Sequence, residues 1–279
     1  MVKNLILRYF GVDPHDGNHR LDQSTGWPDL VMAYPQKPIL IVLHQENSNP
    51  GRVAQALRAR GYRLDIRKPR FGDPLPETMQ AHAGAIVFGG PMSANDNEDY
   101  IRVETDWFRV PLREQAPVLG ICLGAQMMAR HLGAQVFARP DGHVEIGYYP
   151  ISPTPCGCNL TNAWPDKVYQ WHREGHDLPA GATLLAQSDL FACQAYRYGP
   201  AAFGIQFHVE LTLAMVHRWT VRGAARLTLP GARPRGEHFA ERAIYDAASR
   251  TWLERFLSQW LESDARARND APACMAAGT

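Results

Sequence analysis

The sequence predicts an α/β fold in which helices flank a mostly parallel central sheet. In the first half of the chain, short runs of apolar residues alternate with segments whose apolar residues recur at helical spacing. An uninterrupted apolar run is typical of a strand that is buried on both faces of a parallel sheet. Strands and helices that alternate at this spacing are typical of β-α-β units, so the pattern indicates the fold class.

The first strand of the expected sheet is the apolar run at residues 39–43. Asn49 and Pro50 then form a common start of a helix, an N-cap followed by a proline at the first helical position. Gly61 stands where a glycine often ends a helix. Residues 62–66 alternate between polar and apolar side chains and predict a second strand, which completes the β-α-β unit.

The alternation continues along the chain. The expected elements are, in order, a buried strand at 85–88, a helix at 99–115, a strand at 117–120 and a helix at 125–131 that ends at Gly133. The second half contains short β-like segments at 145–151, 183–186, 192–198 and 202–207. Residues 252–261 carry apolar side chains on one helical face and predict an amphipathic helix that packs on the body of the fold.

We expect one folded domain, residues 37–263, with a polar segment on either side of it. A chain of 279 residues fits one large domain or two small ones, and no internal repeat or linker divides this one. Residues 1–36 are polar and rich in turn formers, which predicts a loosely attached extension. Residues 264–279 are small and polar, which predicts a disordered tail.

Composition and charge exclude several classes of protein. The chain has 29 lysine and arginine residues against 28 aspartate and glutamate residues, a formal net charge of +1, so we expect neither a nucleic acid nor a membrane as partner. The hydrophobic fraction of 45% allows a sizeable core and excludes disorder throughout. No stretch approaches the ~20 apolar residues of a membrane span. The odd number of cysteines, 5, leaves a free thiol, which predicts a cytoplasmic location.

The segment Gly120-Ile121-Cys122-Leu123-Gly124 stands where a strand turns sharply into a helix. Such a nucleophile elbow strains the backbone of its central residue, and other parts of the chain approach it so closely that small residues are needed on both sides. The following helix points its positive N-terminus at the sulfur and favours the reactive thiolate. Cys122 is therefore the candidate nucleophile.

A base and an orienting group for this nucleophile come later in the chain. His208 stands at the end of the apolar strand expected at 202–207, and Glu210 follows two residues on. Residues i and i+2 of an extended chain project to the same side, so Glu210 can orient the imidazole of His208. A cysteine nucleophile needs such a base, and the base needs such an orienter.

The loop after the strand at 85–88 supplies the remaining part of the expected site. Gly89-Gly90-Pro91 stands at the carboxyl end of a parallel strand, the edge of the sheet where ligands collect. Glycines there let backbone N–H groups approach a ligand. We expect the N–H groups of Gly90 and Leu123 to form an oxyanion hole.

Together these residues give the chain a strong resemblance to the class I glutamine amidotransferase domain, in particular to the amidotransferase part of GMP synthase. The matching segments occur in the family's order and are Phe88-Gly89-Gly90-Pro91, Gly120-Ile121-Cys122-Leu123-Gly124-Ala125-Gln126, Glu145-Ile146-Gly147, Gln170-Trp171-His172 and Gly204-Ile205-Gln206-Phe207-His208-Val209-Glu210. The resemblance covers about residues 38–220 and implies a flavodoxin-like fold of three layers. The family usually has a proline where this chain has Val209, a change that leaves the triad's residue types intact.

The resemblance implies that the protein hydrolyses glutamine without a cofactor. Cys122 would attack the side-chain amide and form a γ-glutamyl thioester, and His208, held by Glu210, would protonate the departing ammonia. Water activated by His208 would then release glutamate. The ammonia would be released, or delivered to a separate synthetase or acceptor chain.

The resemblance also assigns residues to the substrate. Gln126 would help to hold it, and the segment around Trp171-His172 would line the same pocket. The same triad would equally serve a γ-glutamyl peptide hydrolase, whose leaving group is a larger amine. A catalytically quiet regulatory or binding protein on this fold is a further interpretation, although all three residues of the triad are present.

Two other pairs of residues are candidates for metal or redox sites. His172 and His176 are four residues apart, the spacing of a helical zinc pair, but the glycine and proline around them predict a loop and no motif supplies a third ligand. Cys156 and Cys158 are separated by one residue, whereas the common metal and redox motifs have two, and we expect them in a loop as well. We therefore expect no metal ion.

Overall fold

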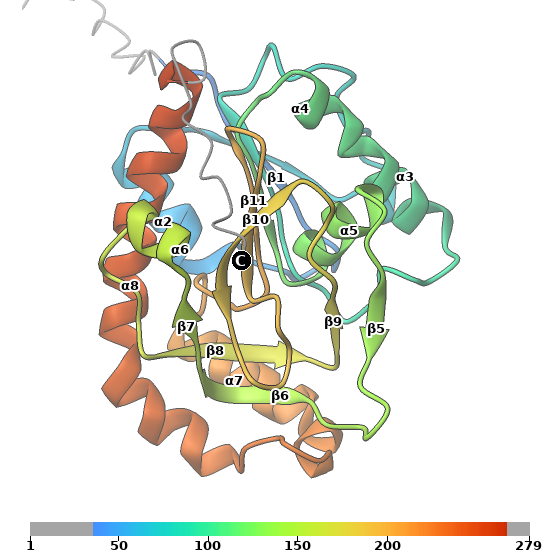
Figure 1. Ribbon diagram of the computed structural model, residues 1–279. Coiled ribbons are helices and arrows are strands. Elements are labelled where there is room, and N and C mark those ends of the chain that lie inside the picture. The colour runs from blue at the N-terminus through green and yellow to red at the C-terminus, as the bar shows by residue number, and fades with distance from the viewer. Residues whose placement is uncertain (1–35, 267–279) are drawn as a thin grey trace, which may run out of the picture. The chain divides into compact units, whose positions relative to one another are not determined.

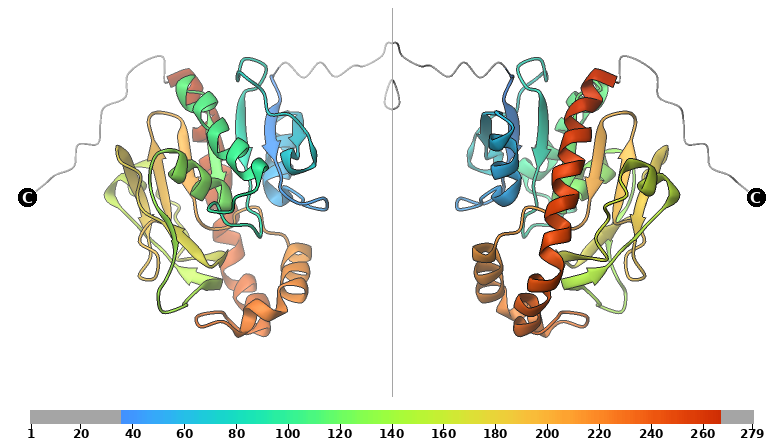
Figure 2. Two further views of the ribbon diagram at one scale, coloured as in Figure 1. Left: turned by 90° about the vertical axis from the view of Figure 1, so that its right-hand side faces the viewer. Right: turned by 90° about the vertical axis from the view of Figure 1, so that its left-hand side faces the viewer.

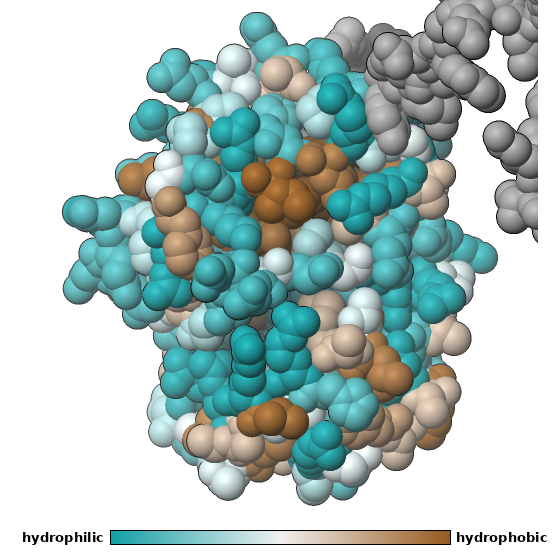
Figure 3. Space-filling model, turned by 180° about the vertical axis from the view of Figure 1, so that it is seen from behind, coloured by the Kyte–Doolittle hydropathy of each residue, from teal (hydrophilic) through white to brown (hydrophobic). Residues whose placement is uncertain are grey.

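The structure of the protein is a computed structural model that describes residues 36–266. The extension predicted for residues 1–36 and the tail predicted for residues 264–279 lie almost wholly outside the described residues. Within residues 36–266, no helix is long and apolar enough to cross a membrane. Figure 3 shows one face of the molecule, on which hydrophilic side chains predominate around smaller apolar patches.

A sheet of eight strands forms the centre of the described part of the chain (Figure 1). Its strands follow the order β2-β1-β3-β4-β12-β11-β10-β7. The first five run parallel: β2 Leu64–Arg67, β1 Ile39–Val42, β3 Gly84–Val87, β4 Val118–Ile121 and β12 Ala202–Ile205. The last three alternate in direction: β11 Ala195–Tyr198, β10 Ala182–Gln187 and β7 Ser152–Pro153. The predicted α/β fold with a mostly parallel sheet is confirmed.

Helices cover both faces of this sheet. Figure 2 shows the long helix α8, which lies along one of them. The α-helices are α2 Gly51–Ala59, α3 Asp99–Trp107, α4 Arg109–Arg113, α5 Leu123–His131, α6 Pro155–Leu160, α7 Leu213–Arg222 and α8 Arg235–Arg266. Two short 3-10 helices are η2 Pro69–Phe71 and η3 Ala224–Thr228.

Strand β1 illustrates how the three layers pack. Ile39 and Ile41 pack in one hydrophobic core with residues of α2 and α8, whereas Leu40 and Val42 pack in a second core with residues of α3 and α5. Successive side chains of a strand point to opposite faces of its sheet. Because helices cover both faces, β1 is apolar at every position, as its sequence predicts.

Two small ribbons stand beside the central sheet. Strands β6 Glu145–Pro150 and β8 Lys167–His172 pair antiparallel, and so do β5 Val136–Ala138 and β9 Glu174–His176. Figure 1 shows β6 and β8 next to α7. Tyr148 of β6 and Tyr169 of β8 form a third hydrophobic cluster with Met215 and Val216 of α7.

Two predicted helices differ from the observed ones. The helix predicted at 99–115 is divided at Phe108 into α3 and α4, because Pro111 has no N–H to donate to the carbonyl of Trp107. The predicted amphipathic helix at 252–261 is only the apolar end of α8, which begins at Arg235. The first half of α8 is largely exposed, so it lacks the apolar stripe by which a helix is recognised in a sequence.

Two segments expected as loops have regular structure, which corrects the sequence-based prediction. Cys156 and Cys158 lie in α6, where the Thr154 hydroxyl caps the helix by accepting a hydrogen bond from the Gly157 N–H at 3.2 Å. His172 and His176 end β8 and β9. Within residues 36–266, no three histidine, cysteine, aspartate or glutamate side chains are grouped as metal ligands.

Candidate active site

Cys122 lies in the sharp turn between β4 and α5, with a φ of 52° and a ψ of −107°. A side chain at positive φ costs about 1–3 kcal/mol, so the surrounding chain must hold this conformation in place. A Cβ atom on Gly120 would lie 2.6 Å from the Ala125 nitrogen, and one on Gly124 would lie 2.1 Å from the Val87 carbonyl oxygen. The two glycines therefore allow the elbow to pack against β3 and against its own helix.

His208 and Glu210 lie beyond the end of β12, and both are buried. His208 Nδ1 and Glu210 Oε1 are 2.7 Å apart, as the spacing of two residues predicts. The strand itself ends at Ile205, so His208 lies in an irregular segment, after a bend at Gln206 and Phe207, and not at the strand end expected from the sequence. The backbone N–H of His208 donates to the Tyr169 carbonyl at 2.9 Å, which fixes this segment against β8.

The N-terminus of α2 holds the backbone of Glu210. The Arg52 N–H donates to the Glu210 carbonyl oxygen at 2.9 Å. Gly51 has a φ of +54°, and a Cβ atom there would lie 2.1 Å from the same oxygen, so only glycine fits this close approach. Asn49 Oδ1 accepts a hydrogen bond from the Gly51 N–H at 2.7 Å, but the N-cap is Pro50 and the helix begins at Gly51, one residue later than predicted.

The charges around His208 favour an imidazolium. Burial of the ring by itself lowers its pKa, but Glu210 and Cys122 outweigh burial and raise the pKa of His208 to about 10. The ring and the sulfur approach the same point, because a Cβ atom on Gly89 would lie 2.9 Å from His208 Cε1 and 3.8 Å from Cys122 Sγ. A protonated His208 beside the sulfur stabilises the Cys122 thiolate, and so does the N-terminus of α5.

The loop Gly89-Gly90-Pro91 follows β3 and lies beside Cys122. Among the described residues, no acceptor is found for the backbone N–H of Gly90 or of Leu123, the two predicted oxyanion donors. Gly90 lines the cavity beside Cys122, whereas Leu123 is buried and is not among the lining residues. His44 braces this loop: its Nδ1 lies 3.3 Å from the Gly89 carbonyl oxygen and its Nε2 lies 2.5 Å from Glu104 Oε2. His44 and Glu104 are both buried and were not singled out in the sequence, although a histidine directly after a buried strand was a visible signal.

A cavity of about 500 Å³ opens on Cys122. Of the residues predicted for the site, Gly90, Cys122, His208, Glu210 and Trp171 line it. Its aromatic wall is made by Trp171 of β8 and Trp219 of α7, and the ring centroids of Trp219 and His208 are 4.8 Å apart. Helix α7 was missed in the sequence, yet Thr212 signals its start, since its hydroxyl accepts a hydrogen bond from the Met215 N–H at 3.3 Å.

Two residues assigned to the substrate by resemblance do not line this cavity. The Gln126 side-chain amide donates to the Glu174 carbonyl at 2.7 Å and to Gln206 Oε1 at 3.2 Å, so it joins α5 to β9 and to the segment before His208. His172 Nε2 lies 2.9 Å from Glu145 Oε2, inside the protein. Both side chains have structural partners in place of a ligand.

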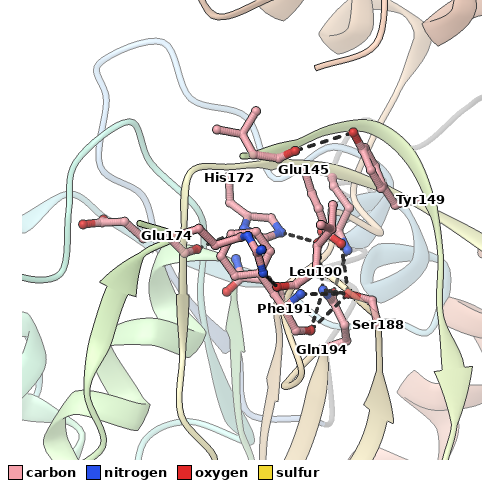
Figure 4. A network of polar contacts seen from close by, with 12 residues as sticks. Glu145, Tyr149, His172, Glu174, Ser188, Leu190, Phe191 and Gln194 are labelled. Carbon is pink, nitrogen blue, oxygen red and sulfur yellow. Dashed lines mark hydrogen bonds and ion pairs between the residues drawn. The ribbon is translucent and has the colours of Figure 1, made fainter. Parts of the chain in front are cut away.

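The His172 contact belongs to a buried polar network around Glu145 (Figure 4). Besides His172, the Glu145 carboxylate accepts hydrogen bonds from Ser188 Oγ at 2.9 Å and from Gln194 Nε2 at 2.8 Å. These contacts tie β6 and β8 to the segment that leads into β11. Neighbouring side chains of a strand point in opposite directions, so the network holds β8 with Trp171 toward the cavity.

Comparisons with known proteins agree with this architecture. The family model "Glutamine amidotransferase class-I" matches residues 41–218. The glutamine amidotransferase-like protein YfeJ of Salmonella typhimurium is 30% identical over 184 residues, which are 63% of this chain and 76% of that protein. GMP synthase of Synechocystis is 33% identical over 133 residues, which are 46% of this chain and only 23% of the synthase.

Solved structures with a similar backbone belong to the same class of protein. A glutamine amidotransferase from Methylobacillus flagellatus is 26% identical, with a TM-score of 0.76 over 82% of this chain and 95% of that chain. A glutamine amidotransferase from Thermotoga maritima is 28% identical, with a TM-score of 0.72 over 81% of this chain and 98% of that chain.

Proposed function

The chain belongs to the class I glutamine amidotransferase family, and from this premise we propose that it hydrolyses the side-chain amide of glutamine through Cys122, His208 and Glu210. The observation that carries the proposal is the position of His208. Its Nδ1 is 2.7 Å from Glu210 Oε1, its ring lies beside Gly89 as the Cys122 sulfur does, and Glu210 and Cys122 together raise its pKa to about 10. A cysteine at a strained elbow, a charged histidine and an orienting carboxylate form a complete nucleophilic site.

In the first half of the reaction, the Cys122 thiolate attacks the carbon of the substrate carboxamide. The negative charge that develops on the amide oxygen accepts hydrogen bonds from the Gly90 and Leu123 N–H groups. The C–N bond then breaks, and the nitrogen takes a proton from His208 and leaves as ammonia. A γ-glutamyl thioester stays on Cys122.

In the second half, water hydrolyses this thioester. His208, now neutral, takes a proton from the water as the oxygen attacks the thioester carbon. The C–S bond breaks, glutamate is released, and Cys122 returns to the thiolate beside the imidazolium. Glu210 holds the ring in one orientation through both steps by accepting the hydrogen bond from Nδ1.

The proposal includes no cofactor, since each step uses side chains and amides of this chain. The destination of the ammonia has two candidates, release into solution or transfer to a separate synthetase or acceptor chain. The relatives named GMP synthase support the second, because this chain spans only 23% of the Synechocystis synthase. The cytoplasmic location that the cysteine count predicts is part of the same proposal.

The test measures ammonia and glutamate released from L-glutamine by the purified chain. We expect equal amounts of both products, and a rate at least about a thousandfold lower for Cys122→Ala. Cys193→Ala is the matched control, because Cys193 is also a buried free cysteine and burial raises its pKa to about 12. It lies outside the cavity, so its replacement leaves the rate unchanged. Release by Cys122→Ala at the wild-type rate contradicts the proposal.

A further inference from the structure

Arginine side chains from the C-terminal half of α7 and from the segment after it line the cavity. Arg218, Arg222 and Arg226 recur every four residues through α7 and η3, and all three line the cavity that contains Cys122. Arg70 joins them from η2. Four cations from two separate parts of the chain therefore face one cavity.

These cations are not neutralised within the described part of the protein. Among residues 36–266, Arg222 and Arg226 form no ion pair, and Arg218 donates only to the Asn47 carbonyl at 3.0 Å. The Arg70 guanidinium lies over the rings of Phe71 and Tyr100, 5.9 and 5.6 Å from their centroids.

The acidic residues of the cavity do not balance this charge. Glu46 and Glu210 are the carboxylates that line it, and Glu210 already pairs with His208. The formal net charge of the whole chain is only +1, so the cluster does not reflect a generally basic surface. Arg70, Arg218 and Arg222 are exposed and Arg226 is half-buried, so the cluster lies at the open side of the cavity. A local excess of cations there attracts anionic ligands.

Arg226 also lies near a cation that is not part of this cluster. The Arg226 side chain is half-buried, and its pKa is lowered by burial and further by the nearby charge of Arg173. Cys122 acts in the opposite direction on Arg226, so the guanidinium lies within electrostatic range of the reacting sulfur. An acidic group of a ligand would relieve the repulsion and offer charge-assisted, bidentate hydrogen bonds.

We propose that, besides glutamine, the site takes a γ-glutamyl compound with an acidic group in addition to its α-carboxylate, as in a γ-glutamyl amino acid, and that Arg222 and Arg226 bind this group. The inference rests on the proposed amide hydrolysis at Cys122 and names a further substrate class for it. The cavity, about 500 Å³, falls in the ~300–1,000 Å³ range of pockets that take drug-sized ligands, so it has room beyond a single amino acid. The steps at Cys122 are unchanged: the C–N bond breaks, and an amino acid takes the proton from His208 and leaves.

The test compares two ligands that share the γ-glutamyl part and differ in one charge. γ-Glutamylglycine ends in a carboxylate where γ-glutamylethylamide ends in a methyl group. Calorimetry with the Cys122→Ala protein measures binding without turnover. We expect γ-glutamylglycine to bind at least about tenfold more tightly, since one charge-assisted contact is enough for that factor.

Replacing the arginines identifies the origin of the preference. Adding Arg222→Gln and Arg226→Gln to the Cys122→Ala protein reduces the preference for γ-glutamylglycine to less than about threefold. Arg250→Gln is the matched control, since Arg250 is an exposed arginine of α8 outside the cavity, and it keeps the full preference. Equal binding of the two ligands, no measurable binding of γ-glutamylglycine, or a preference that survives the double substitution overturns the inference.

Turnover by the protein with Cys122 intact separates this inference from the proposed function. If γ-glutamylglycine binds more tightly through the arginines but neither it nor glutamine is hydrolysed, the anion subsite stands and the amide hydrolysis is wrong. If both γ-glutamyl amides are hydrolysed with equal kcat/KM, the hydrolysis stands and the anion subsite is wrong.

Discussion

His208 is protonated in the folded protein because two neighbours outweigh its burial. Glu210 accepts a hydrogen bond from Nδ1, and the Cys122 sulfur lies beside Gly89 together with the ring. Their combined effect raises the pKa of His208 from the ordinary 6.5 to about 10. A histidine whose pKa is higher in the folded than in the unfolded chain stabilises the fold as long as it is protonated in the folded state, and most where it is protonated in both states.

This shift predicts a pH dependence of stability. The contribution of His208 is fully present below about pH 6.5 and is lost as the pH rises from there through about 10. Glu210→Gln removes the carboxylate, so it lowers the pKa of His208 and flattens this pH dependence. NMR titration of the imidazole measures the pKa, and urea unfolding between pH 6.5 and pH 10 measures the stability. Identical pH dependences for the wild type and Glu210→Gln contradict this explanation of the shift.

The elements whose character depends on local sequence were predictable. The strand at 39–43 was recognised because every residue is apolar, and the elbow around Cys122 because its glycines have specific positions. Where an element depends on contacts with distant parts of the chain, the pattern of apolar residues in its own sequence is weaker. The first half of α8 is largely exposed and shows no continuous apolar stripe, and Pro111 interrupts a segment whose apolar residues favour one continuous helix.

The apolar end of α8 is an integral part of the fold, so we expect that shortening one of its buried side chains lowers the free energy of unfolding substantially. Trp252 is 1% exposed and stacks on Phe256 with ring centroids 4.9 Å apart, and it meets Phe207 edge-on at 5.4 Å. Trp252→Ala therefore lowers the free energy of unfolding by about 3–5 kcal/mol. Denaturant unfolding measures the effect. Arg250→Ala on the exposed face of the same helix changes it by less than about 0.5 kcal/mol, and equal effects of the two substitutions are incompatible with this packing.

At the scale of the whole molecule, the site is an assembly of segments that are far apart in the sequence. Cys122 comes from the elbow, Gly90 from the loop after β3, and His208 from the segment after β12. Each could be proposed from its own motif because parallel strands bring their carboxyl ends to one edge. Trp219 and the arginines of α7 could not be proposed, since their place at the cavity depends on how α7 packs on β6 and β8.

This assembly predicts that residues 1–35 are dispensable for the chemistry. All the strands of the described sheet and all the residues proposed for the site lie within residues 36–266. A chain that begins at residue 36 therefore keeps its rate of glutamine hydrolysis within about twofold of the full chain. Loss of hydrolysis in a truncated chain that still unfolds cooperatively would mean that the first 35 residues contribute to the site.

The central claim, that Cys122 is the nucleophile, is tested most directly by the covalent intermediate. The protein is mixed with L-glutamine, quenched in acid within the first turnovers, and weighed by intact-mass spectrometry with peptide mapping. We expect a mass increase equal to one γ-glutamyl group on the peptide that contains Cys122, and none in Cys122→Ala. Sustained glutamine hydrolysis without any such adduct, or with the adduct on another residue, would contradict the account.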